Sequence, residues 1–209
     1  MNHATRVAAS ALGIYAGLLG MAHGIYEVLQ GVVNPESFMF NAIGPPCQAS
    51  KTAHACFPAM SIVPNMRVTG VLAILVGLLM VTWAAAFIQR KHGGLVMILL
   101  SILLLLVGGG FIPPMIGILS GALGSRINTP LTWRLRHLSD RANQVLTKIW
   151  PWSLVAFFSW ILLQMVLGVV ITELVLKIDS IFFLIEFGLL VLVALSAFAF
   201  DIQNNALGT

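Results

Sequence analysis

Long apolar runs separated by short polar segments dominate the chain. Apolar and small residues fill four stretches, which extend from about Arg6 to Gln30, Asn65 to Gln89, Pro151 to Leu174 and Ser180 to Phe200. Each stretch has about the 20 residues that an α-helix needs to cross the hydrocarbon core of a bilayer. The runs are too long and unbroken for the alternating strands of a membrane barrel. The pattern therefore predicts an all-α fold, a polytopic transmembrane helical bundle with four long crossings and a single integral membrane domain over residues 1–209.

A fifth apolar region, residues 94–124, is interrupted near its middle. Three glycines at 108–110 are followed by Pro113 and Pro114, and both residue types break helices. The run from Met115 to Gly124 is only about half of what a crossing needs. We expect a broken helical hairpin around Gly108 to Pro114 that turns near the outer surface. Whether its second arm crosses fully or is re-entrant stays open, and a plain tight hairpin is the alternative to a functional turn.

Basic residues in the connecting segments predict the orientation of the chain. Arg90, Lys91 and His92 end the second crossing, and Asp140 is the only acid in residues 125–150 beside five basic residues: Arg126, Arg134, Arg136, Arg141 and Lys148. Because cytoplasmic loops are enriched in Lys and Arg, we expect both segments and both termini to be cytoplasmic, in the cell membrane. The net charge of +4 then reflects orientation and lipid contact, with nothing that indicates nucleic-acid binding.

Residues 129–150 predict a separate amphipathic helix on the cytoplasmic membrane surface. Thr129 and Pro130 form a typical helix start, and Trp133 suits an interfacial anchor. Apolar residues recur at helical spacing opposite Arg134, Arg141 and Lys148. Each basic residue near an anionic leaflet contributes about 1 kcal/mol, so anionic lipid headgroups are the expected partner. A helix that binds a protein partner would show the same pattern.

The segment 31–64 is expected to be an extracytoplasmic loop. It carries five of the nine prolines and both cysteines. Unstructured loops longer than about 12 to 15 residues usually have a function or a constraint. Cys47 and Cys56 are expected to form a structural disulfide, which would stabilise the fold by up to about 3 kcal/mol in the chain-entropy model. A redox-active pair is the alternative, but the spacing is not C-x-x-C.

Glycines at spacings of three and four follow one face of the first run. Helices approach closely where small residues line both surfaces, so periodic glycines indicate helix packing. The expected packing positions are Gly13, Gly17, Gly20 and Gly24 in the first run, with Gly117 and Gly121 in the second arm of the hairpin.

Five acidic or basic residues fall within or at the ends of the apolar runs, in the expected outer half of the bundle: His23, Glu27, Arg67, Glu173 and Glu186. Four of these ionisable residues form the candidate site: His23, Glu27, Arg67 and Glu186. The whole chain is 59% hydrophobic and only 9% charged, so each such residue stands out against its surroundings. Ionisable residues inside a membrane usually face the bundle interior and mark solute or ion sites. Structural ion pairs, such as Arg67 with Glu27, are the competing interpretation.

These observations favour two functions. The first is the binding or passage of a small solute or ion, or of a proton, at a site formed by the four ionisable residues. The second is an accessory or scaffold subunit that docks a membrane partner, or a second copy, through outward-facing glycines. An enzyme is less favoured because no nucleophile with an adjacent base is visible. No cofactor is expected, since His23 alone cannot supply two haem ligands and no zinc motif is present.

Overall fold

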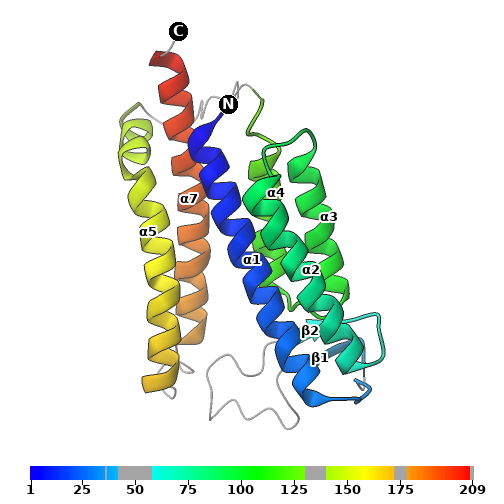
Figure 1. The fold of residues 1–209 in the computed structure, drawn as a ribbon. Coiled ribbons are helices and arrows are strands. Elements are labelled where there is room, and N and C mark those ends of the chain that lie inside the picture. The colour runs from blue at the N-terminus through cyan, green and yellow to red at the C-terminus, as the bar shows by residue number, and fades with distance from the viewer. Residues whose placement is uncertain (36, 42–57, 130–139, 172–177, 208–209) are drawn as a thin grey trace. The chain divides into compact units, whose positions relative to one another are not determined.

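The computed structural model describes residues 1–35, 37–41, 58–129, 140–171 and 178–207, which are almost entirely helical (Figure 1). The elements in order are α1 (His3–Gln30), β1 (Met39–Asn41), β2 (Pro58–Met60), α2 (Met66–Ala86), α3 (Gly93–Leu106), α4 (Ile112–Gly124), α5 (Asp140–Val170) and α7 (Asp179–Leu207).

Four helices are long and apolar enough to cross a membrane. They are α1, α2, residues 141–168 of α5 and residues 180–205 of α7. Large apolar side chains remain exposed along α2 and α3, among them Leu75, Leu79, Leu99 and Leu103. In water such a continuous apolar surface would be unusual, whereas lipid covers it without penalty. Length, composition and surface together indicate an integral membrane protein.

The chain separates into two compact units. Unit 1 comprises Met1–Ala8 and Arg126–Thr209, and unit 2 comprises Ala9–Ser125. Most of α1 therefore belongs to unit 2, together with α2, α3, α4 and both strands, while α5 and α7 belong to unit 1.

In unit 2, α1 runs alongside α2 (Figure 1), and glycines bring the two backbones together. A Cβ on Gly17 would lie 2.6 Å from the carbonyl oxygen of Gly77, and a Cβ on Gly24 would lie 2.5 Å from that of Gly70. In turn, a Cβ on Gly70 or Gly77 of α2 would meet the carbonyl oxygen of Gly24 or Gly17 on α1. Both pairs are seven residues apart in the sequence, so they recur on one face of each antiparallel helix. This contact has no room for larger residues.

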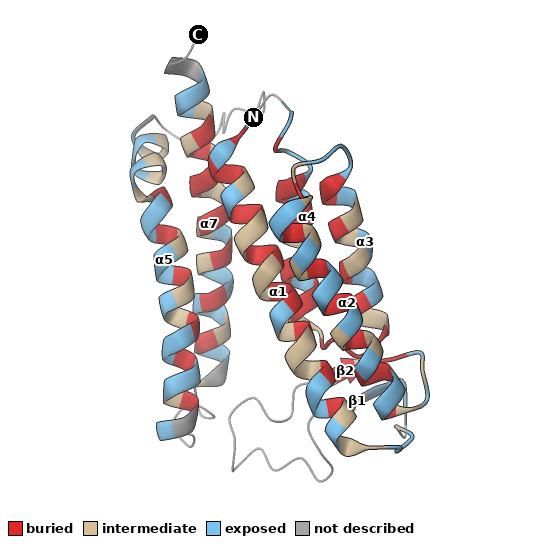
Figure 2. Ribbon diagram, viewed as in Figure 1, coloured by how far each residue is buried: buried red, intermediate tan, exposed pale blue. Residues whose placement is uncertain are grey.

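The arms of the predicted hairpin are α3 and α4, which contain 14 and 13 residues. At 1.5 Å per residue they extend about 21 and 20 Å, less than the hydrocarbon thickness of about 30 Å. Gly94 and Gly121 bring the arms together, since a Cβ on Gly121 would lie 2.6 Å from the Gly94 carbonyl oxygen. Buried residues gather where α1, α2, α3 and α4 face one another (Figure 2).

The connection between α3 and α4 is held by the segment around β2, a strand that the sequence pattern did not predict. Within the expected loop 31–64, β1 and β2 pair in antiparallel fashion with Phe40 opposite Ala59. The chain after β2 then pairs with the end of α3, where Ser61 forms a bridge with Val107 and the Gly108 N–H donates to the Met60 carbonyl at 2.9 Å. Cys47 and Cys56 lie outside the described residues, so their disulfide stays a prediction.

In unit 1, the predicted boundary between a helix over residues 129–150 and a crossing from Pro151 is not observed. Residues 130–139 lie outside the described part, but 140–150 and 151–170 form one continuous helix, α5, with Pro151 in its interior. The helix therefore does not end at residue 150, and the interfacial position of residues 129–150 stays a prediction. Proline removes one backbone hydrogen bond, and the neighbouring turns retain theirs around it.

The N-terminus of α1 is capped by a side chain from the other end of the chain. Asp201 accepts hydrogen bonds from the N–H groups of Ala4 at 3.0 Å and Thr5 at 2.7 Å, and from the Thr5 hydroxyl at 2.7 Å. Asn205 donates to Asn2 at 3.0 Å. The last crossing was predicted to end at about Phe200, whereas α7 continues to Leu207. The two chain ends thus lie at the same end of unit 1.

Candidate functional site

A carboxylate without a partner lies at the centre of the candidate site in unit 2. Glu27 is on the last turns of α1 and is 0% exposed. Both of its carboxylate oxygens are buried and have no hydrogen-bond partner among the described residues. A buried ionised carboxylate without compensation is strongly unfavourable, so the burial of Glu27 without a partner needs an explanation.

The glycine turn between α3 and α4 makes room for this carboxylate. Gly108 has a φ of +91°, a conformation that favours glycine. A Cβ on Gly108 would lie 2.8 Å from Glu27 Cδ and would meet both carboxylate oxygens. On the other side, a Cβ on Gly70 of α2 would lie 2.9 Å from Glu27 Cβ. Two glycines from different elements therefore form the walls around Glu27.

His23 lies beside the same turn, four residues before Glu27 on the same helix face. Gly110, with a φ of +76°, faces its imidazole, and a Cβ there would lie 2.8 Å from His23 Nε2. The Nδ1 atom of His23 is buried and has no hydrogen-bond partner among the described residues. The structure thus places two unsatisfied ionisable groups, His23 and Glu27, against two positive-φ glycines of one turn.

Buried hydroxyl groups fix the position of this turn. Thr69 of α2 donates from Oγ1 to the Val107 carbonyl at 2.8 Å, and its hydroxyl lies 2.5 Å from Ser61 Oγ. The Gly109 N–H donates to the Leu104 carbonyl at 2.9 Å. Because α2, β2 and the end of α3 each hold the turn, its glycines are kept against α1. Neither Thr69 nor Ser61 was among the candidate residues from the sequence.

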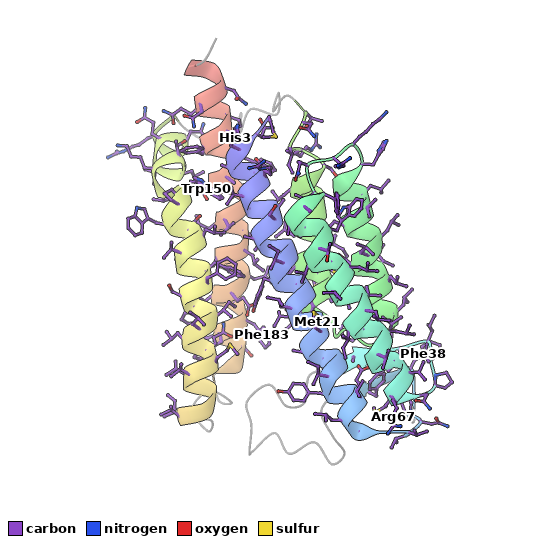
Figure 3. All side chains as sticks on the ribbon, in the orientation of Figure 1. His3, Met21, Phe38, Arg67, Trp150 and Phe183 are labelled. Carbon is purple, nitrogen blue, oxygen red and sulfur yellow. The ribbon has the colours of Figure 1, made fainter. Side chains whose placement is uncertain are left out.

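Arg67 does not neutralise the carboxylate. It lies in the first turn of α2, at the end of unit 2 that holds β1 and β2, and its side chain is exposed (Figure 3). Its guanidinium lies near Gly31, where an added Cβ would be 3.8 Å from a terminal nitrogen. Both Glu27 oxygens lack a partner in the described part of the chain, so no Arg67–Glu27 ion pair is present there.

Glu186 belongs to a separate polar contact in unit 1. The Gln164 Nε2 of α5 donates to a carboxylate oxygen of Glu186 on α7 at 3.4 Å, and both residues are only 7% exposed. Elsewhere along the same two helices, the hydroxyls of Ser153 and Ser196 are 2.8 Å apart and also join α5 to α7. Of the four candidate residues, the structure therefore brings together His23 and Glu27 in unit 2, while Glu186 is paired within unit 1.

The packing glycines predicted from the sequence all face residues of unit 2. A Cβ on Gly13 would lie 2.8 Å from Ser120 Oγ, and one on Gly20 would lie 2.6 Å from a methyl of Leu104. Gly117 meets Ser101 and Met80 in the same way. With the Gly17 and Gly24 contacts to α2, the glycine face of α1 is covered by the chain itself. It is therefore not available for a partner.

No group of three or more His, Cys, Asp or Glu side chains that could hold a metal ion is found among the described residues. Comparison with protein-family models, curated proteins and solved structures finds no match to this chain. The function must therefore be argued from the site itself.

Proposed function

We propose that this chain is a polytopic membrane protein that binds or passes a small cation, a proton included, at the buried carboxylate of Glu27 beside His23. The observation that carries the proposal is the burial of both Glu27 oxygens without a partner in the described residues. A carboxylate in this environment needs a positive partner, and an unpaired buried charge removed from water is strongly destabilising. A bound cation or proton supplies what the described residues lack.

The structural interpretation of Glu27 has less support than the functional one. A structural carboxylate is normally held by hydrogen bonds, as Asp201 is by three donors at the start of α1. Glu27 has no such partner among the described residues. Intramembrane ionisable residues of this kind typically mark solute or ion pathways.

The orientation of the proposed protein follows from the charges. Cytoplasmic termini in the cell membrane are proposed from the basic segments at 90–92 and 125–150. Glu27 then lies in the outer half, since it is near the far end of the first crossing. Anionic lipid headgroups remain the proposed partner of Arg141 and Lys148, both exposed near the start of α5.

Uptake into vesicles tests this proposal. The purified full chain is reconstituted into vesicles, and proton, Na⁺ and K⁺ fluxes are followed for the wild type, Glu27→Gln and Glu186→Gln. We expect Glu27→Gln to abolish a flux that Glu186→Gln retains, with equal amounts of folded protein. If Glu27→Gln instead unfolded, and did not lose only its flux, Glu27 would be a structural residue.

A further inference from the structure

We propose that the ligand of this site is a single proton, shared between Glu27 and His23. The inference rests on the function proposed above and narrows its ligand class. Its basis is the charge of the two side chains, the space around them and the oxygen atoms that surround them.

The charge of the pair favours one bound proton. With Glu27 ionised and His23 neutral, the pair carries a net negative charge, and two added protons would give it a net positive charge. With one added proton the pair is neutral, whether the proton is on the carboxylate or on the imidazole. Because charge is disfavoured in a buried environment, the neutral state is the stable one.

No other charged group among the described residues changes the charge of this pair. The only nearby ionisable group on α2 is Arg67, whose side chain is exposed and points toward Gly31. The residues of the turn, of α4 and of the described strands are not ionisable. On α1 itself, Tyr26 is exposed. The charge of the site is therefore set by Glu27 and His23 in the described part of unit 2.

The space between the glycine turn and the carboxylate excludes a larger ligand. A single added methyl-sized group on Gly108 would already lie 2.8 Å from Glu27 Cδ, and one on Gly110 would lie 2.7 Å from His23 Cε1. An organic cation needs more room than the Cβ that does not fit here. A proton needs one acceptor atom and no additional volume.

Among the described residues, the oxygen atoms around Glu27 do not assemble a metal coordination shell. Hard cations such as Ca²⁺ or Mg²⁺ take about six oxygen ligands. The carbonyls of Val107 and Met60 each accept a hydrogen bond, from Thr69 and from the Gly108 N–H. The two hydroxyls nearest the turn, those of Ser61 and Thr69, are paired with each other. Glu27 is then the only carboxylate left to bind a metal ion at this turn in the described residues.

The proton transfer breaks one bond, forms one bond and leaves the net charge of the pair unchanged. The O–H bond of the Glu27 carboxyl breaks as an N–H bond forms on an imidazole nitrogen of His23, and a neutral pair becomes a carboxylate beside an imidazolium. Residues at i and i+4 of a helix are neighbours, so rotation of the two side chains or one water molecule can connect them. The unpartnered Nδ1 of His23 is the nitrogen available for this bond.

Infrared spectroscopy of the full chain in lipid nanodiscs tests the proposal through the C=O band of a protonated carboxyl group. We expect a band near neutral pH that Glu27→Gln removes and that Glu186→Gln and added Na⁺ or K⁺ leave in place. His23→Gln should increase the band, because the proton then has no second site. A band that His23→Gln leaves unchanged would overturn sharing.

The outcomes separate this inference from the proposed function. Loss of the Glu27 band on addition of Na⁺ or K⁺ at constant pH would overturn the proton as the ligand and leave a cation site at Glu27. A Glu27 that remains ionised and responds to neither pH nor cations would overturn both proposals.

Discussion

The carboxylate of Glu27 occupies the space that a side chain on Gly108 would need. The residues come from α1 and from the turn between α3 and α4, which are far apart in the sequence. A Cβ on Gly108 would meet both oxygens and lie 2.8 Å from Cδ. The identity of residue 108 is thus set jointly by its φ of +91° and by the acid opposite.

Gly108→Ala should therefore lower the free energy of unfolding by about 2 to 5 kcal/mol. Backbone strain at positive φ contributes about 1 to 2 kcal/mol, and overpacking against Glu27 contributes about 1 to 3 kcal/mol. Chemical unfolding of the purified chain in detergent measures the change. Gly188→Ala is the matched control, because nothing lies within 4 Å of its Cβ and alanine should stabilise α7 by about 0.5 to 1 kcal/mol.

A double variant tests whether the carboxylate causes the clash. Removing the carboxylate with Glu27→Ala should relieve the overpacking, so Glu27→Ala with Gly108→Ala should lose less stability than the two single variants added together. Residues in contact show coupling energies of about 0.5 to 3 kcal/mol. Losses that simply add would show that Glu27 and Gly108 are not in contact.

The glycine contacts between α1 and α2 predict a loss of stability in the isolated chain. Gly17→Ala and Gly77→Ala should each lower the free energy of unfolding by about 1 to 3 kcal/mol, because each Cβ would meet the carbonyl oxygen of the opposite glycine at 2.6 Å. Unfolding should not depend on protein concentration. If both variants were as stable as wild type, with only an oligomer lost, these glycines would be docking residues.

The cap of α1 by Asp201 predicts that its removal destabilises the helix ends near the two termini. Asp201→Ala removes three hydrogen bonds to the first turn of α1 and should lower the free energy of unfolding by about 1 to 2 kcal/mol. Asp201→Asn keeps a carbonyl acceptor and should lose less. Hydrogen exchange at the Thr5 amide should become faster in Asp201→Ala. Unchanged exchange there would contradict the cap.

The hydrogen bond between Gln164 and Glu186 predicts a loss of stability when only Gln164 is replaced, and a recovery when both are replaced. Gln164→Leu leaves Glu186 buried without its donor and should lower the free energy of unfolding by about 1 to 3 kcal/mol. Gln164→Leu with Glu186→Leu should recover most of this loss, because an apolar pair has no unsatisfied polar group. Thermal unfolding of the three chains measures it, and a double variant less stable than Gln164→Leu would assign Glu186 another partner.

The sequence predicted the helices better than their ends. Runs of apolar residues located the four long helices, and the glycines and prolines near 108–114 located the break between α3 and α4. Two boundaries differed, the end of α7 and the start of α5. Asp201 stays helical because it caps α1, and α5 runs through Pro151 without a break.

The candidate site could be predicted only in part. His23 and Glu27 stood out because ionisable residues are rare in apolar helices, and their spacing placed them on one face. The turn that receives them depends on a contact between α1 and the α3–α4 connection, and no local pattern reveals such a contact. Ser61 and Thr69 were missed for the same reason, because their hydroxyls look ordinary until β2 places them together.

The pH dependence of unfolding, compared between wild type and Glu27→Gln in detergent at constant salt, shows whether the folded chain holds a proton at Glu27. If the folded chain holds a proton at Glu27 that the unfolded chain releases, wild-type stability must fall as the pH rises, since the folded state then binds more protons. We expect this fall in wild type and in Glu186→Gln, and its loss in Glu27→Gln. Identical pH profiles for wild type and Glu27→Gln would contradict it.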